Sequence, residues 1–144
     1  GLRERLLTLF SGTESGEVFE VIVQSFGFKY GIPMEADMVF DMRCLENPYY
    51  VDELRDLTGL DGRIERFVLG ADGTMDYLGR ILDLVRSKLP RFAREGRGTL
   101  VLGIGCTGGR HRSVVAARWL ADRLREDGKN VVLRHRDIRE EAEK

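Results

Sequence analysis

The sequence is poor in cysteine, proline and long apolar runs. It has two cysteines and three prolines in 144 residues, and two thiols are too few for a disulfide framework. Its apolar stretches are far shorter than the roughly 20 residues that span a bilayer. The opening segment, GLRERLLTLF, is broken by charges and lacks the cleavage site of a secretory signal. We therefore expect free thiols, no membrane segment and a cytoplasmic location.

An excess of one charge is also lacking. Lysine and arginine number 23, aspartate and glutamate 24, and the formal net charge is -1. This balance excludes a uniformly basic nucleic-acid binder but leaves room for a local basic patch. Because 42% of the residues are hydrophobic, the chain can bury one core. We expect a short helix and polar linker over residues 1–16, followed by one domain over residues 17–144.

Apolar strands and amphipathic helices make up most of that domain. Runs of β-branched and aromatic residues predict strands over residues 18–26, 38–42, 98–105 and 131–133. Helical spacing predicts helices from Thr74 to Leu89, where Pro90 should kink or end the helix, and over residues 113–127. We expect a helical turn over residues 51–57, a loop-rich, glycine-punctuated stretch over residues 59–73, and a charged tail that is helical or frayed.

The strand, helix and strand over residues 99–133 predict a βαβ unit with parallel pairing. The predicted fold class is α/β, with an open, mainly parallel sheet and flanking helices. In such sheets ligands bind at the carboxyl ends of the strands. The first two predicted strands are joined by a connection that barely suffices for a crossover, so their topology stays open.

The segment LVLGIGCTGGRHRSVV predicts a phosphate-binding strand, loop and helix. Gly108 and Gly109 allow close approach of the backbone to an anion, and the helix start presents unpaired N–H groups. Arg112 can hold two oxygens at once, while hydroxyls and His111 can add donors. The alternative is that the two glycines simply form a strand-to-helix turn.

Two other chemistries fit parts of this segment. The spacing of Cys106 and Arg112 matches the loop of a cysteine-dependent phosphatase. However, Gly105 stands where such enzymes carry a histidine, and Asp37 or Asp41 would have to act as the general acid. No Walker A motif is present in the sequence. A zinc site is disfavoured because its candidate ligands lack close paired spacing; these are Cys44, Cys106, His111 and His135.

Polar residues near the other strand ends are candidates for ligand contacts. Asp41 and Arg43 share one face of a strand. They can pair with each other, or Asp41 can bind sugar hydroxyls or an ammonium group while Arg43 joins the anion site, which suits an amino-sugar phosphate. The segment from Asn47 to Tyr50 is a predicted turn whose side chains could close over a ligand. A basic rim could contact nucleic acid, although an acidic tail follows it; its members are Lys29, Arg110, Arg112, Arg134 and Arg136.

Five motifs together resemble the C-terminal domain of the RapZ/YvcJ family over about residues 25–138. They are SFGFKYGIP, VFDMRCLENPYY, LTGLDG, GIGCTGGRHRSV and GKNVVLRHRDI. The resemblance implies that residues 2–10 form a connecting helix to an N-terminal P-loop domain that is absent here. That domain would bind ATP or GTP, with weak ATPase and GTPase activity. The present domain would be a regulatory module without cofactor or metal, and we do not expect it to be an enzyme.

The resemblance also implies partners and site residues. It implies that the domain binds a phosphorylated amino sugar such as glucosamine-6-phosphate, or a related sugar phosphate or nucleotide sugar. The pocket for this ligand would be formed by Asp41, Asn47, Cys106, Thr107, Gly108, Gly109, His111 and Arg112. It implies a small regulatory RNA, an endoribonuclease and a homo-oligomer as further partners. The RNA face would include Lys29, Arg134 and Arg136. Two departures are Tyr49, where RapZ carries a histidine, and the acidic tail, where RapZ is basic.

Overall fold

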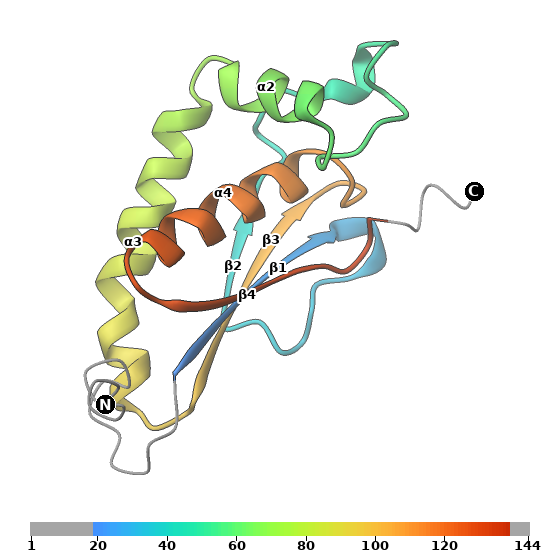
Figure 1. The fold of residues 1–144 in the computed structure, drawn as a ribbon. Helices are drawn as coiled ribbons and strands as arrows, with labels where there is room; N and C mark the ends of the chain where they lie inside the picture. The colour runs from blue at the N-terminus through green and yellow to red at the C-terminus, as the bar shows by residue number, and fades with distance from the viewer. Residues whose placement is uncertain (1–18, 139–144) are drawn as a thin grey trace.

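The β-branched and aromatic segments of the chain form one parallel sheet. The computed structural model describes residues 19–138, and within them the strands are β1 (Glu20–Gly27), β2 (Met38–Asp41), β3 (Thr99–Cys106) and β4 (Asn130–His135). Their order is β2-β3-β1-β4, and every neighbouring pair is parallel (Figure 1). The α/β prediction is confirmed, and all four carboxyl ends lie at the same edge of the sheet.

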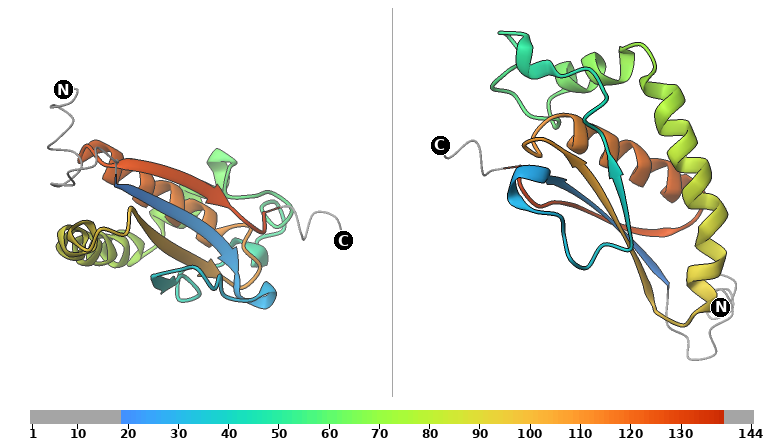
Figure 2. Two further views of the ribbon diagram at one scale, coloured as in Figure 1. Left: turned by 90° about the horizontal axis from the view of Figure 1, so that it is seen from below. Right: turned by 180° about the vertical axis from the view of Figure 1, so that it is seen from behind.

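The connection between β1 and β2 settles the topology that the sequence left open. The two strands do not pair with each other, because β3 lies between them. The connecting residues include the 3-10 helix η1 (Phe28–Tyr30) and run along the sheet face away from the helices (Figure 2). There Asp37 exchanges hydrogen bonds with Val101 of β3, its N–H donating to the carbonyl at 2.8 Å and its carboxylate accepting from the amide at 2.8 Å.

In the part of the chain that the structure describes, three α-helices contact one another, and the last two of them also contact the sheet. They are α2 (Gly62–Gly70), α3 (Thr74–Arg94) and α4 (Arg112–Glu126), and α4 packs across β1, β3 and β4 (Figure 1). Alternate residues of β3, Leu100, Leu102 and Ile104, are fully buried in the core beneath the helices. Because α4 follows β3 after a short loop, its first turn is fixed at the carboxyl edge of the sheet.

The prediction that Pro90 kinks or ends its helix was wrong about the ending, because α3 continues to Arg94. Proline in a helix interior removes one backbone hydrogen bond and costs about 3 kcal/mol. Leu89 and Ala93 lie on the buried stripe on either side of it and are 4% and 5% exposed. Burying this last turn offsets the cost, and Pro90 itself faces solvent.

The stretch predicted to be loop-rich contains a helix that the sequence analysis missed. Gly62 and Gly70 are the first and last residues of α2, where glycine interrupts nothing. The Asp61 side chain caps the helix by accepting from the Arg63 amide at 2.9 Å. The helical turn expected over residues 51–57 is instead a series of turns, which follow the 3-10 helix η2 (Pro48–Tyr50).

Some predicted elements fall outside the described residues. These are the helix over residues 2–10, the linker up to residue 16 and the charged tail after residue 138. Among the helices in residues 19–138, none is both long and apolar enough to cross a membrane.

Candidate functional site

The loop between β3 and α4, here called the glycine loop, comprises residues 107–111. Gly109 has a φ of 80°, a backbone conformation that favours glycine. The loop packs directly on the end of β1, where a Cβ on Gly27 would lie 2.5 Å from the Gly108 carbonyl carbon. These glycines therefore allow two backbone segments to meet at a distance that side chains would prevent.

The backbone amides of the glycine loop are unpaired within the described part of the chain. No oxygen in residues 19–138 accepts a hydrogen bond from the amides of Gly108 to Ser113. The first intrahelical bond at this end is the one from Val115 to the His111 carbonyl at 3.1 Å. A helix N-terminus with free donors favours a bound anion, because its N–H groups and dipole both attract negative charge.

Arg112 is buried beneath this loop, with only 5% of its surface exposed. Its Nη1 donates to the carbonyls of Arg43 at 2.9 Å and Leu45 at 3.2 Å. Its Nη2 lies 3.5 Å from the Thr107 hydroxyl, and its Nε has no hydrogen-bond partner within the described residues. The guanidinium therefore holds the loop that follows β2, and among the described residues its buried Nε is the donor that still lacks a partner.

His111 ties the start of α4 to the loop that precedes α2. Its Nε2 donates to the Leu57 carbonyl at 2.6 Å and lies 3.1 Å from the Arg55 carbonyl. Burial, followed by the charges of neighbouring arginines, lowers the pKa of His111 below its usual value despite these bonds. In the neutral ring the proton is thus assigned to Nε2, and the ring offers a ligand only the Nδ1 acceptor.

The LTGLDG motif, residues 57–62, packs against the glycine loop and the start of α4. The Gly59 amide donates to the Arg110 carbonyl at 2.8 Å. A Cβ on Gly59 would lie 2.7 Å from the Val114 side chain and 2.8 Å from the His111 carbonyl. Glycine at this position lets the motif clamp the glycine loop from the side opposite β1.

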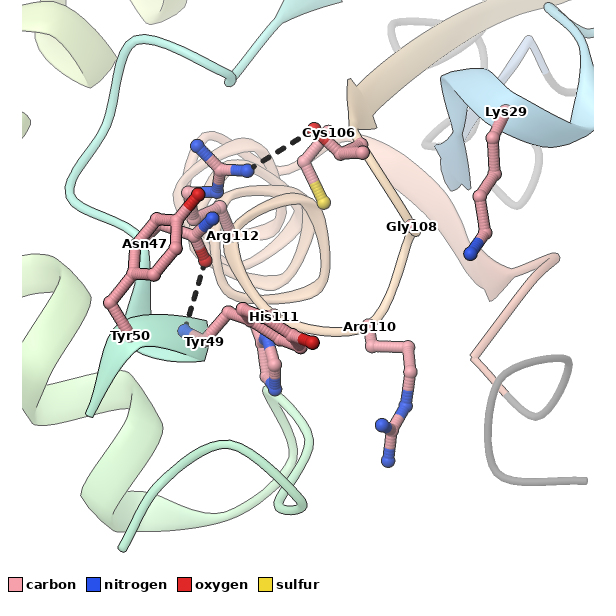
Figure 3. Close-up of a pocket in the computed structure, with 10 residues that line it drawn as sticks. Lys29, Asn47, Tyr49, Tyr50, Cys106, Gly108, Arg110, His111 and Arg112 are labelled. Carbon is pink, nitrogen blue, oxygen red and sulfur yellow. Dashed lines mark hydrogen bonds between the residues drawn. The ribbon is translucent and has the colours of Figure 1, made fainter. Parts of the chain in front are cut away.

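A pocket of about 330 Å³ opens over the glycine loop (Figure 3). Figure 3 shows Asn47, Tyr49 and Tyr50 on one side of the glycine loop, with Lys29 and the side chain of the loop residue Arg110 on the other side. The described residues of the lining include three side chains of fixed positive charge and no carboxylate. They are Lys29, Asn47, Tyr49, Tyr50, Cys106, Thr107, Gly108, Arg110, His111 and Arg112.

The segment after β2 forms the aromatic side of the pocket. Asn47 caps η2 by accepting from the Tyr49 amide at 3.0 Å. Arg55 donates from Nε to the Tyr49 carbonyl at 2.9 Å, and its guanidinium lies 5.2 Å from the centre of the Tyr49 ring. The segment thus forms the expected turn, and its side chains also reach the pocket.

Asp41 and Arg43 pair with each other and do not line the pocket. The Asp41 carboxylate accepts from the Arg43 guanidinium at 2.7 Å, and this hydrogen bond is the main cause that lowers the pKa of Asp41. The guanidinium also lies 4.1 Å from the centre of the Phe28 ring. Nearby, the Tyr77 hydroxyl donates to the Asp41 carbonyl at 2.6 Å. Of the two alternatives drawn from the sequence, the structure contains the ion pair.

The basic residues assigned to RNA fall into two groups. Lys29 and Arg110 line the pocket. Arg134 is exposed on β4. Arg136 lies just after β4, where its Nη2 donates to the Gly31 carbonyl at 2.6 Å and to Asp137 at 2.7 Å.

Asp137 is a supporting residue that the sequence pattern did not single out. It is 4% exposed and accepts from the Gly27 amide at 2.8 Å. A Cβ on Gly109 would lie 3.0 Å from the Asp137 Cβ, so this carboxylate stands directly behind the glycine loop. An acidic residue just past a strand's carboxyl end, within a motif of the family, was the only signal for it.

Cys106 is 2% exposed, and its thiol donates to the Ser113 hydroxyl at 3.2 Å. The two proposed general acids are engaged elsewhere, since Asp37 pairs with Arg97 and Asp41 pairs with Arg43. Among the zinc candidates, Cys44 is exposed and His135 is hydrogen-bonded to Ser25 at 2.7 Å. Within residues 19–138, no cluster of three or more metal-ligating side chains occurs.

Comparison with known proteins places this chain in a family. The sequence profile of the RapZ C-terminal domain matches residues 19–139. A nucleotide-binding protein of Bacillus cytotoxicus is 49% identical over 137 residues, which cover 95% of this chain and 46% of that protein. Nucleotide-binding proteins of Desulforudis audaxviator and Caldanaerobacter subterraneus are each 45% identical, covering 95% and 97% of this chain and 47% and 49% of their own lengths. The chain thus spans about half the length of these curated relatives. It belongs to the RapZ C-terminal domain family.

Proposed function

We propose that this domain is a sensor that binds a phosphorylated metabolite over the glycine loop without reacting with it. The ligand class is a phosphorylated amino sugar or a related sugar phosphate or nucleotide sugar. The observation that carries the proposal is the set of unpaired amides from Gly108 to Ser113, which lie beside the buried, incompletely bonded guanidinium of Arg112. Backbone amides and a guanidinium are the donors that phosphate oxygens favour.

Amide chemical shifts test the phosphate site directly. In a titration with inorganic phosphate and with glucosamine-6-phosphate, the ¹⁵N–¹H signals of Gly108 to Ser113 should move. The signals of Gly70 in α2 and Gly79 in α3, which lie outside the pocket lining, should stay fixed. If no signal of the loop moves when either ligand is saturating, or if all signals move equally, there is no anion site at this loop.

Calorimetry tests the guanidinium. Arg112→Ala should weaken phosphate binding by about 1.5–3 kcal/mol, the scale of a lost charge-assisted hydrogen bond. Arg134→Ala removes an exposed charge of the same type outside the pocket and is the matched control. Equal affinities for the two variants would remove Arg112 from the site.

The amino group of the ligand has its own test. Asp41 is the carboxylate that the sequence assigns to the amino group. To bind it, Asp41 would have to exchange its bond to Arg43 for one to the ligand ammonium. If it does so, glucosamine-6-phosphate binds more tightly than glucose 6-phosphate, and Asp41→Asn abolishes the difference. Equal affinities for the two sugars assign the site to sugar phosphates without preference for the amine.

RNA binding is a second candidate function, favoured by the exposed Arg134 on β4 and by the cations Lys29 and Arg110 at the pocket. Binding to phosphates through such groups weakens steeply as salt rises. A gel-shift titration with a structured RNA should therefore give a complex at low salt that Arg134→Ala weakens. The absence of any complex at low salt contradicts this function.

Catalysis by Cys106 is the alternative to pure binding. Two observations oppose it. The Cys106 thiol donates its proton to Ser113, and Asp37 and Asp41 are paired with arginines. Turnover of an aryl phosphate that disappears in Cys106→Ser would establish a phosphatase and replace the sensor proposal.

For the full-length protein we propose a cytoplasmic homo-oligomer. Its other half would bind ATP or GTP, in keeping with the name that the relatives carry. Its output partners would be a small regulatory RNA and an endoribonuclease or another regulatory protein.

A further inference from the structure

Two aromatic side chains at the pocket, Tyr49 and Tyr50, remain open to solvent. We call them the tyrosine wall. They are 49% and 78% exposed, although both line the pocket. Exposed aromatic surface beside a cavity is typical of a ligand-binding surface.

Tyr49 makes more contacts with the rest of the chain than Tyr50 does. Tyr49 is held by Asn47 through its amide and by Arg55 through its carbonyl, and the Arg55 guanidinium lies near its ring. Tyr50 packs only its ring against Tyr49, at 5.7 Å between ring centres and 85° between planes, and its amide donates to the Asn47 carbonyl at 3.3 Å. Tyr49 therefore positions the wall, while the Tyr50 ring keeps most of its surface available.

The opposite side of the pocket has a different chemistry. Lys29 and Arg110 offer only hydrogen-bond donors, and the glycine loop between the two sides offers unpaired amides. A phosphate on the loop thus has an aromatic surface on one side and polar donors on the other. A sugar ring fits this arrangement, because its C–H face is apolar and its hydroxyls accept hydrogen bonds. The cavity of about 330 Å³ is at the small end of ligand pockets.

We propose that Tyr50 is the specificity-determining residue that recognises the sugar ring of the ligand. This inference rests on the proposed phosphate site over the glycine loop. It adds that a ring-bearing phosphate monoester binds more tightly than the same phosphate without a ring, and that the difference comes from the tyrosine wall.

Four probes in a calorimetric titration separate the ring from the phosphate. Inorganic phosphate and glycerol 3-phosphate lack a ring, whereas glucose 6-phosphate and glucosamine-6-phosphate carry one. Tyr50→Ala should weaken both ring-bearing probes about tenfold, the scale of one lost aromatic contact, and change the other two less than about twofold. Tyr50→Phe keeps the ring and should bind all four probes as the parent does. Leu60→Ala, at a site 55% exposed and outside the pocket lining, is the control.

The outcomes distinguish this inference from the function beneath it. If the parent protein binds none of the four probes, the phosphate site itself is wrong. If it binds all four equally, or if Tyr50→Ala weakens all four by the same factor, the phosphate site stands and the role of Tyr50 is overturned. Unchanged binding of inorganic phosphate by Tyr50→Ala also shows that the variant is folded.

Discussion

Replacing Gly27 by alanine adds one methyl group where β1 meets the glycine loop. The new Cβ would lie 2.5 Å and 2.6 Å from the carbonyl carbon and oxygen of Gly108, and 2.9 Å from the Gly109 amide nitrogen. All three atoms are backbone, so no flexible side chain can move aside. The Gly27 φ of -106° suits any residue, so the effect is purely steric. Overpacking of this kind costs about 1–3 kcal/mol.

The same displacement should also weaken phosphate binding. If the loop moves enough to break one amide hydrogen bond to the phosphate, the loss is about 1.5–3 kcal/mol, which is at least roughly tenfold in affinity. Urea unfolding and calorimetry with inorganic phosphate measure the two effects separately. Gly79→Ala is the matched control, because its Cβ meets nothing within 4 Å inside α3, and it should stabilise the chain by about 0.5–1 kcal/mol. A Gly27→Ala protein with the parent's stability and affinity would refute the close contact and the role given to the loop.

Three further predictions concern the supports of the site. Burial lowers the pKa of His111, so the folded chain favours its neutral form. The free energy of unfolding should therefore fall as the pH drops below about 6.5. Urea titrations across this range should show a less steep fall in His111→Asn. Asp137→Ala leaves the Gly27 amide without its acceptor and should cost about 1–3 kcal/mol in urea unfolding, whereas an unchanged midpoint would argue against that bond. Burial is the main cause that raises the pKa of Tyr77 to about 12, so ultraviolet titration should find one tyrosine that ionises late and that Tyr77→Phe removes.

Local pattern was enough to predict most of the fold. The apolar run before Cys106 and the helical spacing after Arg112 predicted β3 and α4, because each buries a continuous stripe in the core. The α2 helix escaped because Gly62 and Gly70 were interpreted as breakers. Their places at its two ends depend on the Asp61 cap and on packing against α3 and α4.

The site was predictable only where its chemistry is contiguous in sequence. The glycine loop follows from its residue types. By contrast, the Arg43 and Leu45 carbonyls that engage Arg112 come from a distant loop, and only the fold brings them there. The separation of Asp41 from the pocket has the same origin, since its partner Arg43 lies two residues away and satisfies it locally.

The central position of β1 has a consequence for how the chain folds. Glu20, at its start, pairs with Thr99 on one side and Asn130 on the other, so both neighbours of this strand lie much later in the sequence. Such non-local pairing slows folding, because the intervening loop must close before any of these contacts forms. During synthesis, β1 leaves the ribosome long before its partners, so it has no strand to pair with until β3 and β4 have been synthesised.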